Sequence, residues 1–295
     1  GVKYNLGFSL ADYKSKVLQF TDMTNVPFPG NLGRGDRIEN WNGNAKNYYL
    51  VGKSLSPVYV FQTDGIFQTQ EEVDAYYEMY YWNADHTAPK AGNIIPAPAD
   101  SGTGRLRPGA RKVVDLDGDG VITKDDIYYA GDRDPHLTFT IKAGLEWKGI
   151  DVSAFFQGVG NQVVLRQGQI PYLWRTNYVM QNKTYMGKTW TPENTGAEYT
   201  IASRDQNFNA WNYQYKDVSL QKNRYIRLKS LVVGYTLPKQ WTAKAGLNKV
   251  RLYFSGDDLW EWTKVKDGYD PEFGEETNNS FPFSRLLSFG VDVTF

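Results

Sequence analysis

Residues 283–295, FSRLLSFGVDVTF, form the stretch that decides how this chain folds. Apolar and polar residues alternate along it: Phe283, Leu287, Phe289, Val291, Val293 and Phe295 share one phase, and Ser284, Ser288, Gly290, Asp292 and Thr294 share the other. Side chains of an extended strand point alternately to its two faces. The stretch therefore predicts a β-strand with one apolar face and one polar face.

Such a strand fits a membrane better than water. In a transmembrane barrel the apolar phase faces lipid, the polar phase faces the lumen, and aromatic residues gather at the membrane interfaces. Soluble sheets also alternate, but they rarely end on an exposed aromatic residue such as Phe295. An aromatic terminal strand also resembles the signal by which outer-membrane barrels are recognised for assembly. We therefore expect an all-β fold, an antiparallel transmembrane β-barrel.

Composition excludes several kinds of site. The 33 basic and 33 acidic residues cancel, so no overall field favours nucleic acid. Cysteine is absent, which excludes disulfides, thiol nucleophiles and thiolate metal sites. The two histidines, His86 and His136, lie far apart and form no ligand pair at helical spacing. Aromatic residues reach 15%, which suits interface girdles and sugar-stacking surfaces.

Hydropathy is consistent with a barrel made of strands. The mean hydropathy is −0.56, and the sequence has no apolar run long enough for a transmembrane helix. Barrel strands need only about 9 to 11 residues, of which half are polar. Gly1-Val2-Lys3 is neither a start methionine nor a signal sequence. We expect the chain to be the carboxyl-terminal part of a longer protein.

The chain divides into five predicted segments. Residues 1–20 hold one or two barrel strands, 21–135 a large extracellular loop region, 136–160 a barrel hairpin, 161–224 a second extracellular loop, and 225–295 the carboxyl-terminal barrel strands. Within residues 21–135, residues 70–81 carry the only helical pattern. Lys148-Gly149 predicts a tight hairpin turn, and a change of apolar phase predicts a β-bulge near Lys229-Ser230.

Ten short blocks of this sequence resemble SusC-like TonB-dependent outer-membrane transporters, the RagA/SusC family. They follow the family's order along nearly the whole chain: residues 59–74 (YVFQTDGIFQTQEEVD), 107–109 (RPG), 115–120 (DLDGDG), 147–151 (WKGID), 155–158 (FFQG), 190–194 (WTPEN), 224–229 (RYIRLK), 234–238 (GYTLP), 268–272 (GYDPE) and 288–295 (SFGVDVTF).

The resemblance implies the carboxyl-terminal portion of a barrel of about 22 strands, whose lumen an amino-terminal plug fills. It implies active import of a nutrient across the outer membrane of a Gram-negative cell, with glycan or oligosaccharide first and peptide next. The implied partners are a SusD-like surface lipoprotein, TonB acting through the missing amino-terminal part, outer-membrane lipid and the remaining barrel sequence. The plug and amino-terminal domain are absent, so this chain would supply barrel wall and outer loops, and we expect no enzyme activity.

The residues 115–126, DLDGDGVITKDD, have the spacing of a cation-binding loop. Alternate oxygen ligands converge when such a loop wraps a hard cation. The predicted ligands are Asp115, Asp117, Asp119, the carbonyl of Val121, Thr123 and Asp126. Asp at the last position replaces the usual Glu, and its shorter side chain disfavours bidentate binding, which lowers the expected affinity for Ca²⁺ and lets Mg²⁺ substitute. The alternative is a solvated acidic turn shaped by Gly118 and Gly120.

Other candidates have competing explanations. Tyr80, Trp82, Trp211 and Tyr213 are substrate-stacking candidates, and contact with a lid partner or loop packing explains them equally well. The carboxylates Asp257, Asp258, Glu261, Glu275 and Glu276 suggest a glycosidase, but solvated loop or lumen charges explain them better. Two further rivals stay open: a passive porin, and a soluble calcium-dependent carbohydrate-binding β-protein.

Overall fold

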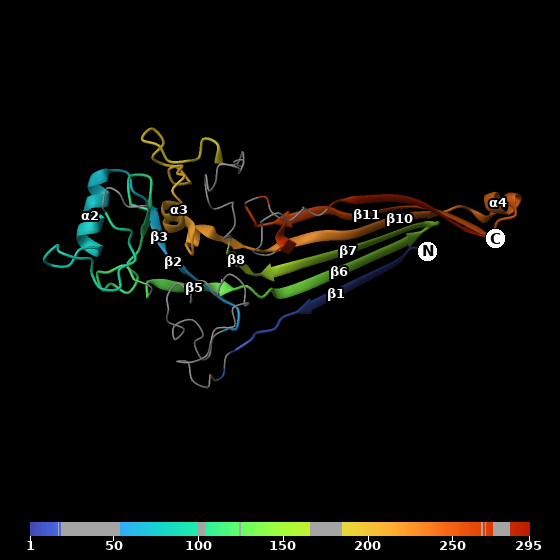
Figure 1. Cartoon of the computed structure of the whole chain (residues 1–295). Coiled ribbons are helices and arrows are strands. Elements are labelled where there is room, and N and C mark those ends of the chain that lie inside the picture. The colour runs from blue at the N-terminus through green and yellow to red at the C-terminus, as the bar shows by residue number, and fades with distance from the viewer. Residues whose placement is uncertain are drawn as a thin grey trace.

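The computed structural model describes residues 1–16, 18, 54–98, 104–123, 125–165, 185–266, 268, 270–273 and 284–295. The predicted continuation of the first strand to residue 20, and the carboxylates Glu275 and Glu276, lie outside these residues. One antiparallel sheet of six long strands runs through the molecule (Figure 1). In sheet order the strands are β1 (Lys3–Ala11), β6 (His136–Trp147), β7 (Ile150–Asn161), β10 (Tyr225–Thr236), β11 (Lys249–Thr263) and β12 (Leu286–Thr294).

The register of the sheet gathers the apolar phases of all six strands on one face. One row across the sheet reads Tyr4, Leu145, Val152, Val233, Phe254 and Phe289. The next row reads Leu6, Ala143, Ala154, Leu231, Gly256 and Leu287. Many of these side chains are exposed, with Tyr4 at 82% and Phe289 at 83%. The sheet therefore presents a continuous apolar face that nothing in the described chain covers.

Two predicted details of the six long strands, here called the wall strands, are confirmed. Trp147 pairs with Ile150 across the turn, so Lys148 and Gly149 form a two-residue hairpin. Both have positive φ, 50° and 88°, which the twist of a tight hairpin requires. The register of β10 shifts between Leu228 and Ser230 against both β7 and β11, which places the predicted bulge at Lys229. The terminal strand is β12, as its alternation predicts.

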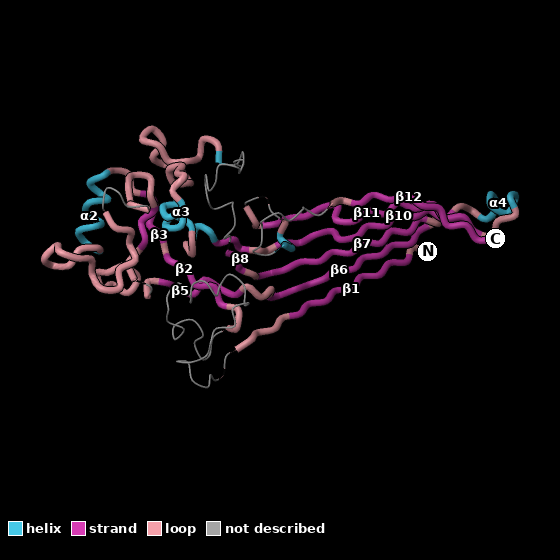
Figure 2. The backbone as a smooth tube through the Cα atoms, in the orientation of Figure 1, coloured by secondary structure: helices cyan, strands magenta, loops and turns pink. Residues whose placement is uncertain are grey.

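The described residues between β1 and β6 and between β7 and β10 fold into a compact body, here called the loop unit, at the end of the sheet away from the Lys148-Gly149 turn (Figure 2). Its elements are β2 (Pro57–Phe61), β3 (Thr63–Ile66), α2 (Gln70–Tyr80), β4 (Arg111–Val113), β5 (Ile127–Asp132), β8 (Val163–Leu165), α3 (Gln206–Tyr213), η3 (Asp217–Ser219) and β9 (Leu220–Lys222). Short helical turns, α4 (Lys239–Thr242), η4 (Ala243–Ala245) and η5 (Pro271–Phe273), follow the wall strands.

The predicted helix at residues 70–81 is confirmed as α2. Thr69 caps it by accepting a hydrogen bond from the Glu72 backbone N–H, and the Glu72 carboxylate accepts one from the Gln68 N–H. The first bond satisfies an N–H group that a helix start leaves unpaired, and the second holds the residue before the cap. The helix α3 (Gln206–Tyr213), capped by Asp205, lies in residues 161–224, where the sequence analysis expects only loop.

The hydrophobic core lies in the loop unit and not on the sheet. It joins residues from the first insert (12–135, between β1 and β6) to residues from the second insert (162–224, between β7 and β10). The main cluster contains Val58, Val60, Phe61, Phe67, Val73, Leu106, Ile122, Val163, Leu165, Phe208, Trp211 and Tyr215. None of the helices in the described residues is long and apolar enough to cross a membrane.

Lys216 is buried inside this core and joins the two inserts. Its ammonium lies 4.5 Å from the centre of the Phe61 ring and 5.1 Å from that of Trp211, and Nζ donates to the Gln214 carbonyl at 3.3 Å. Aromatic faces attract a cation, but burial removes its hydration. Burial lowers the pKa of Lys216 from 10.5 to about 7, against a smaller opposing effect of Asp217.

Replacement of Lys216 by Met tests whether burial lowers the pKa of Lys216. The unfolded chain holds the Lys216 proton up to a higher pH than the folded chain, so the folded loop unit gains stability as pH rises from about 7 toward 10.5. The gain is at most about 1.4 kcal/mol per pH unit. Lys216→Met removes it. The measurement is hydrogen exchange of residues 206–222 in the intact protein, corrected for intrinsic rates. An identical pH dependence in both proteins contradicts the assignment.

Candidate functional site

The predicted cation loop brings three of its carboxylates together. Oxygens of Asp115, Asp117 and Asp126 lie within 4.8 Å of one another. Asp119 is exposed, and its carboxylate accepts a hydrogen bond from the Val121 N–H at 2.8 Å. Carboxylate oxygens at this spacing suit a hard divalent cation.

Hydrogen bonds within the loop give it a tightly wound backbone. The Asp115 carboxylate accepts from the N–H groups of Gly118 and Gly120, at 2.8 and 2.9 Å. Both glycines have positive φ, 77° and 81°, a conformation that side-chain-bearing residues adopt at a cost. Thr123 Oγ1 accepts from the Asp125 N–H at 3.0 Å, so its hydroxyl oxygen stands within the same turn.

The loop is attached firmly to the core of the loop unit. Ile122 is fully buried, and its carbonyl accepts from the Ile94 N–H at 3.0 Å. Lys90 donates through Nζ to the carbonyls of Met79 and Gly120, both at 2.7 Å, which ties the loop to the end of α2. The loop therefore lies against the helix in a fixed position.

Asp126 is the most constrained of the three converging carboxylates. It is fully buried and accepts from the backbone N–H groups of Leu116 at 2.6 Å and Thr123 at 2.7 Å. Burial raises the pKa of Asp126, while these donors and the Asp117 N–H act against the rise. An ionised carboxylate here is held in place but only partly compensated, so a nearby cation would stabilise it.

The four aromatic candidates occupy different environments. Trp211 and Tyr213 are buried, Trp211 donating to the Arg111 carbonyl and Tyr213 bonding to Thr200. These two rings pack the loop unit in this conformation. Tyr80 and Trp82 are half-buried near the end of α2, where Trp82 stacks on His86 with ring centres 6.3 Å apart. Tyr80 and Trp82 are better placed to meet a ligand than Trp211 and Tyr213.

A buried charge cluster on the polar face of the sheet was not predicted. Arg227 is 2% exposed and contacts the carboxylates of Glu261, Asp270 at 2.6 Å and Glu272 at 3.0 Å. Lys229, at the bulge, contacts Asp258 at 2.8 Å and Glu272 at 3.2 Å. The cluster fixes the segment carrying Asp270 and Glu272 against β10 and β11, and it gives Glu261 and Asp258 structural partners.

Part of this charge cluster could have been predicted from the sequence. Arg227 and Glu261 fall opposite each other in the register of β10 and β11, and opposite charges across a strand pair stabilise a sheet. Asp270 and Glu272 come from the segment after β11, which no strand pattern places against Arg227.

Replacing Arg227 by Met takes the cation away from Glu261 and Asp270 and leaves Glu272 with Lys229 alone. Removing one partner of a buried ion pair costs about 3–5 kcal/mol. We expect Arg227→Met to lower the unfolding temperature of the intact protein far more than Arg251→Met, which breaks the more exposed contacts to Asp151 and Asp292. Thermal unfolding in detergent measures both. Equal losses in the two variants would show that the cluster has no special weight.

Replacing Asp126 by Asn removes a carboxylate oxygen that accepts buried N–H donors. A buried donor left without an acceptor costs about 1–3 kcal/mol. We expect Asp126→Asn to speed hydrogen exchange across residues 111–127, whereas Asp119→Asn, at an exposed position, changes it little. Comparable exchange in the two variants contradicts the role given to Asp126.

Comparisons with known proteins agree with this architecture. No family model matches the chain. TonB-dependent receptor P3 of Formosa agariphila is 28% identical over 218 residues, covering 69% of this chain and 21% of the receptor. TonB-dependent receptor P26 of the same organism is 28% identical over 266 residues, covering 86% of this chain and 24% of the receptor. The chain therefore spans about a fifth to a quarter of the length of these relatives.

Solved structures show the same fold. The structure of the RagAB peptide transporter aligns with a TM-score of 0.55 at 19% identity, over 84% of this chain and 24% of that chain. The RagAB peptide importer in its open-open state aligns with a TM-score of 0.54 at 18% identity, over 100% of this chain and 26% of that chain. In sequence and in fold, this chain is like one part of a SusC-like TonB-dependent transporter, the resemblance that its sequence blocks predict.

Proposed function

We propose that this chain supplies barrel wall and outer loops to a transporter that imports a nutrient across the outer membrane of a Gram-negative cell. Import is active and depends on TonB, which acts through sequence outside this chain. The likeness to two TonB-dependent receptors supports the proposal. The chain works by gated passage and carries out no covalent chemistry.

The observation that carries the proposal is the uncovered apolar face of the sheet. Leu6 and Phe8 are 75% and 64% exposed, at positions that a soluble sandwich would bury against a second sheet. The buried hydrophobic residues instead gather in the loop unit. Hydrocarbon against the sheet accounts for this arrangement, whereas a soluble carbohydrate-binding β-protein leaves the face without a partner.

The opposite face suits a lumen. It carries the Arg227 and Lys229 cluster, and Arg251 contacts Asp151 at 2.6 Å and Asp292 at 3.1 Å. Paired charges of this kind belong on a wall that meets water or a plug. A passive porin would share both faces. The named relatives favour a TonB-dependent transporter, and dependence of uptake on TonB separates the two.

The proposed lipoprotein and nutrient would both meet the loop unit. A SusD-like lipoprotein would cover the loop unit, which is in keeping with the RagAB structures that share this fold. The nutrient is a glycan or oligosaccharide by the sequence resemblance, with a peptide second. RagAB is a peptide transporter, but fold likeness at 19% identity does not carry a substrate. Tyr80 and Trp82 are the aromatic residues that a ligand would meet first.

We also propose that the loop at 115–126 binds Ca²⁺, or Mg²⁺ in its place, as a staple of the loop unit. The three converging carboxylates and the partly compensated Asp126 support it. Burial raises the pKa of Asp126, so ionising it lowers folded stability as pH rises through its unfolded and folded pKa values. A bound cation offsets that loss.

Calorimetric titration of the intact protein with calcium tests the staple. We expect binding heat and slower hydrogen exchange in residues 111–127, both larger at neutral pH than in acid, where protons compete for Asp126. Asp115→Asn and Asp117→Asn, combined in one variant, should weaken calcium binding. The absence of heat and of protection, with calcium and with magnesium, contradicts the site.

Adjacent substitutions on β10 test the two faces of the wall. Leu231 lies on the apolar face near the middle of β10, and Val232 lies on the polar face. Arg on a lipid-facing position near the bilayer midplane costs about 2–4 kcal/mol. We expect Leu231→Arg to reduce the amount of intact protein assembled in outer membranes, and Val232→Arg to be tolerated. The reverse order would mean that the faces are assigned wrongly.

Uptake in cells tests the import itself. Cells that express the intact protein and its lipoprotein partner should accumulate labelled oligosaccharide or peptide, and should fail to do so when TonB is deleted. Both substrate classes are offered separately. Accumulation that continues without TonB supports the porin, and soluble protein in cell fractions removes the transporter proposal.

A further inference from the structure

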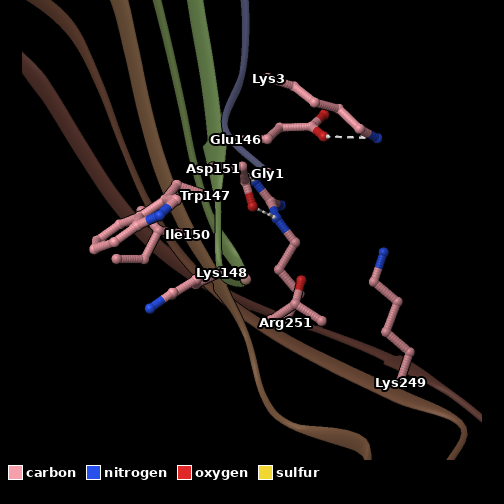
Figure 3. Close-up of a pocket in the computed structure, with 11 residues that line it drawn as sticks. Gly1, Lys3, Glu146, Trp147, Lys148, Ile150, Asp151, Lys249 and Arg251 are labelled. Atoms are coloured by element: carbon pink, nitrogen blue, oxygen red, sulfur yellow. Dashed lines mark hydrogen bonds and ion pairs between the residues drawn. The ribbon is translucent and has the colours of Figure 1, made fainter.

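The hairpin turn between β6 and β7 carries a cation on its apolar side. Figure 3 shows Trp147, Ile150 and Lys148 on one side of the turn and Lys3, Glu146, Asp151, Arg251 and Lys249 on the other. Lys148 Nζ lies 5.2 Å from the centre of the Trp147 ring, which is 46% exposed. A cation held on an exposed indole therefore borders the apolar face.

The neighbouring turn repeats this combination. The segment between β10 and β11 contains α4 and η4, and it lies at the same end of the sheet (Figure 1). Trp241 on α4 is 57% exposed, and Lys239 and Lys244 are exposed beside it in sequence. Both turns at this end therefore pair an exposed tryptophan with lysine.

The lysines of these turns are available to an external anionic partner. The nearby carboxylates are used on the polar side of the sheet, where Glu146 contacts Lys3 at 3.7 Å and Asp151 contacts Arg251 at 2.6 Å. Within the described part of the chain, Lys148, Lys239 and Lys244 form no ion pair. Each of the three therefore remains an exposed positive charge.

A pocket of about 520 Å³ lies at this turn, but its charged lining, Lys3, Glu146, Asp151, Lys249 and Arg251, belongs to the polar side. The apolar side of the turn is the one that carries Trp147, Lys148 and Ile150. Ile150 continues a row of apolar pairs through Tyr235 and Leu252 to Val291. The exposed lysines and tryptophans of the two turns thus stand at the border of an apolar surface.

We propose that a rim made of Lys148, Lys239 and Lys244 with Trp147 and Trp241 binds the phosphate headgroups of anionic phospholipids. An amphipathic ligand matches the border: the acyl chains meet the apolar face, the indoles take the interface, and the lysines meet phosphate. An acidic protein would satisfy the lysines but would leave the adjoining apolar row uncovered. This inference rests on the membrane location proposed above.

Lipid retention by the intact transporter tests the inference. The full-length protein with its partner is purified in detergent, mixed with equal amounts of phosphatidylglycerol and phosphatidylcholine, and analysed by native mass spectrometry. We expect preferential retention of phosphatidylglycerol. A basic residue near an anionic surface contributes about fivefold in binding. Lys148→Gln, Lys239→Gln and Lys244→Gln combined should therefore abolish the preference.

The control removes the same charge at the other end of the sheet. Lys222, Lys264 and Lys266 are exposed there, and their combined replacement by Gln should leave the preference intact. Equal retention of the two lipids by the wild type, or equal loss in both triple variants, overturns the inference. Membrane fractionation of the wild type separates this inference from the proposed membrane location. A protein that sediments with membranes but shows no lipid preference contradicts only the lipid-binding rim. An unchanged unfolding temperature shows that each variant is folded.

Discussion

The whole structure depends on keeping the period-two alternation in register across six strands. Each wall strand exposes one set of side chains to each face, so a slip of one residue would move every apolar side chain to the polar face. The two-residue turn at Lys148-Gly149 fixes the register of β6 and β7. The pairing of β10 is uneven at Lys229: against β7 the extra residue is Lys229, whereas against β11 the extra residue lies on β11. The Lys229 side chain is held by Asp258 and Glu272.

Stability is divided between two kinds of interaction in different places. The sheet is held by backbone pairing and by charges on its polar face, of which the Arg227 cluster is the most buried. The loop unit is held by a conventional hydrophobic core, and its two inserts also meet through polar contacts. Asp217 accepts hydrogen bonds from the Thr63 N–H and hydroxyl, at 3.0 and 2.7 Å, and the Phe61 N–H donates to the Tyr215 carbonyl. The sheet and the loop unit therefore depend on different kinds of interaction for their stability.

Sequence reasoning succeeded where a local pattern determines the structure. Alternation located the wall strands, the positive-φ turn at Lys148-Gly149 and the phase change at Lys229, and acidic residues after Thr69 marked α2. It failed where tertiary contacts decide. The segment 206–213, QNFNAWNY, has weak helical propensity, and α3 forms because Phe208 and Trp211 pack into the core. The burial of Arg227 could not be predicted, since Asp270 and Glu272 reach it from a segment without periodicity. The spacing of the acidic loop gathered Asp115, Asp117 and Asp126, but could not show that the fully buried Asp126 would be the anchor.

The shared core of the loop unit has an evolutionary consequence. Phe61 and Ile122 come from the first insert, while Val163 and Trp211 come from the second, and they pack in one cluster. Recombination that replaced one insert alone would place mismatched surfaces against each other and lose the fold of both. New ligand preferences in such a protein are therefore expected to arise by point substitution on the surface of the unit, or by joint inheritance of both inserts, while the strands beneath them stay unchanged.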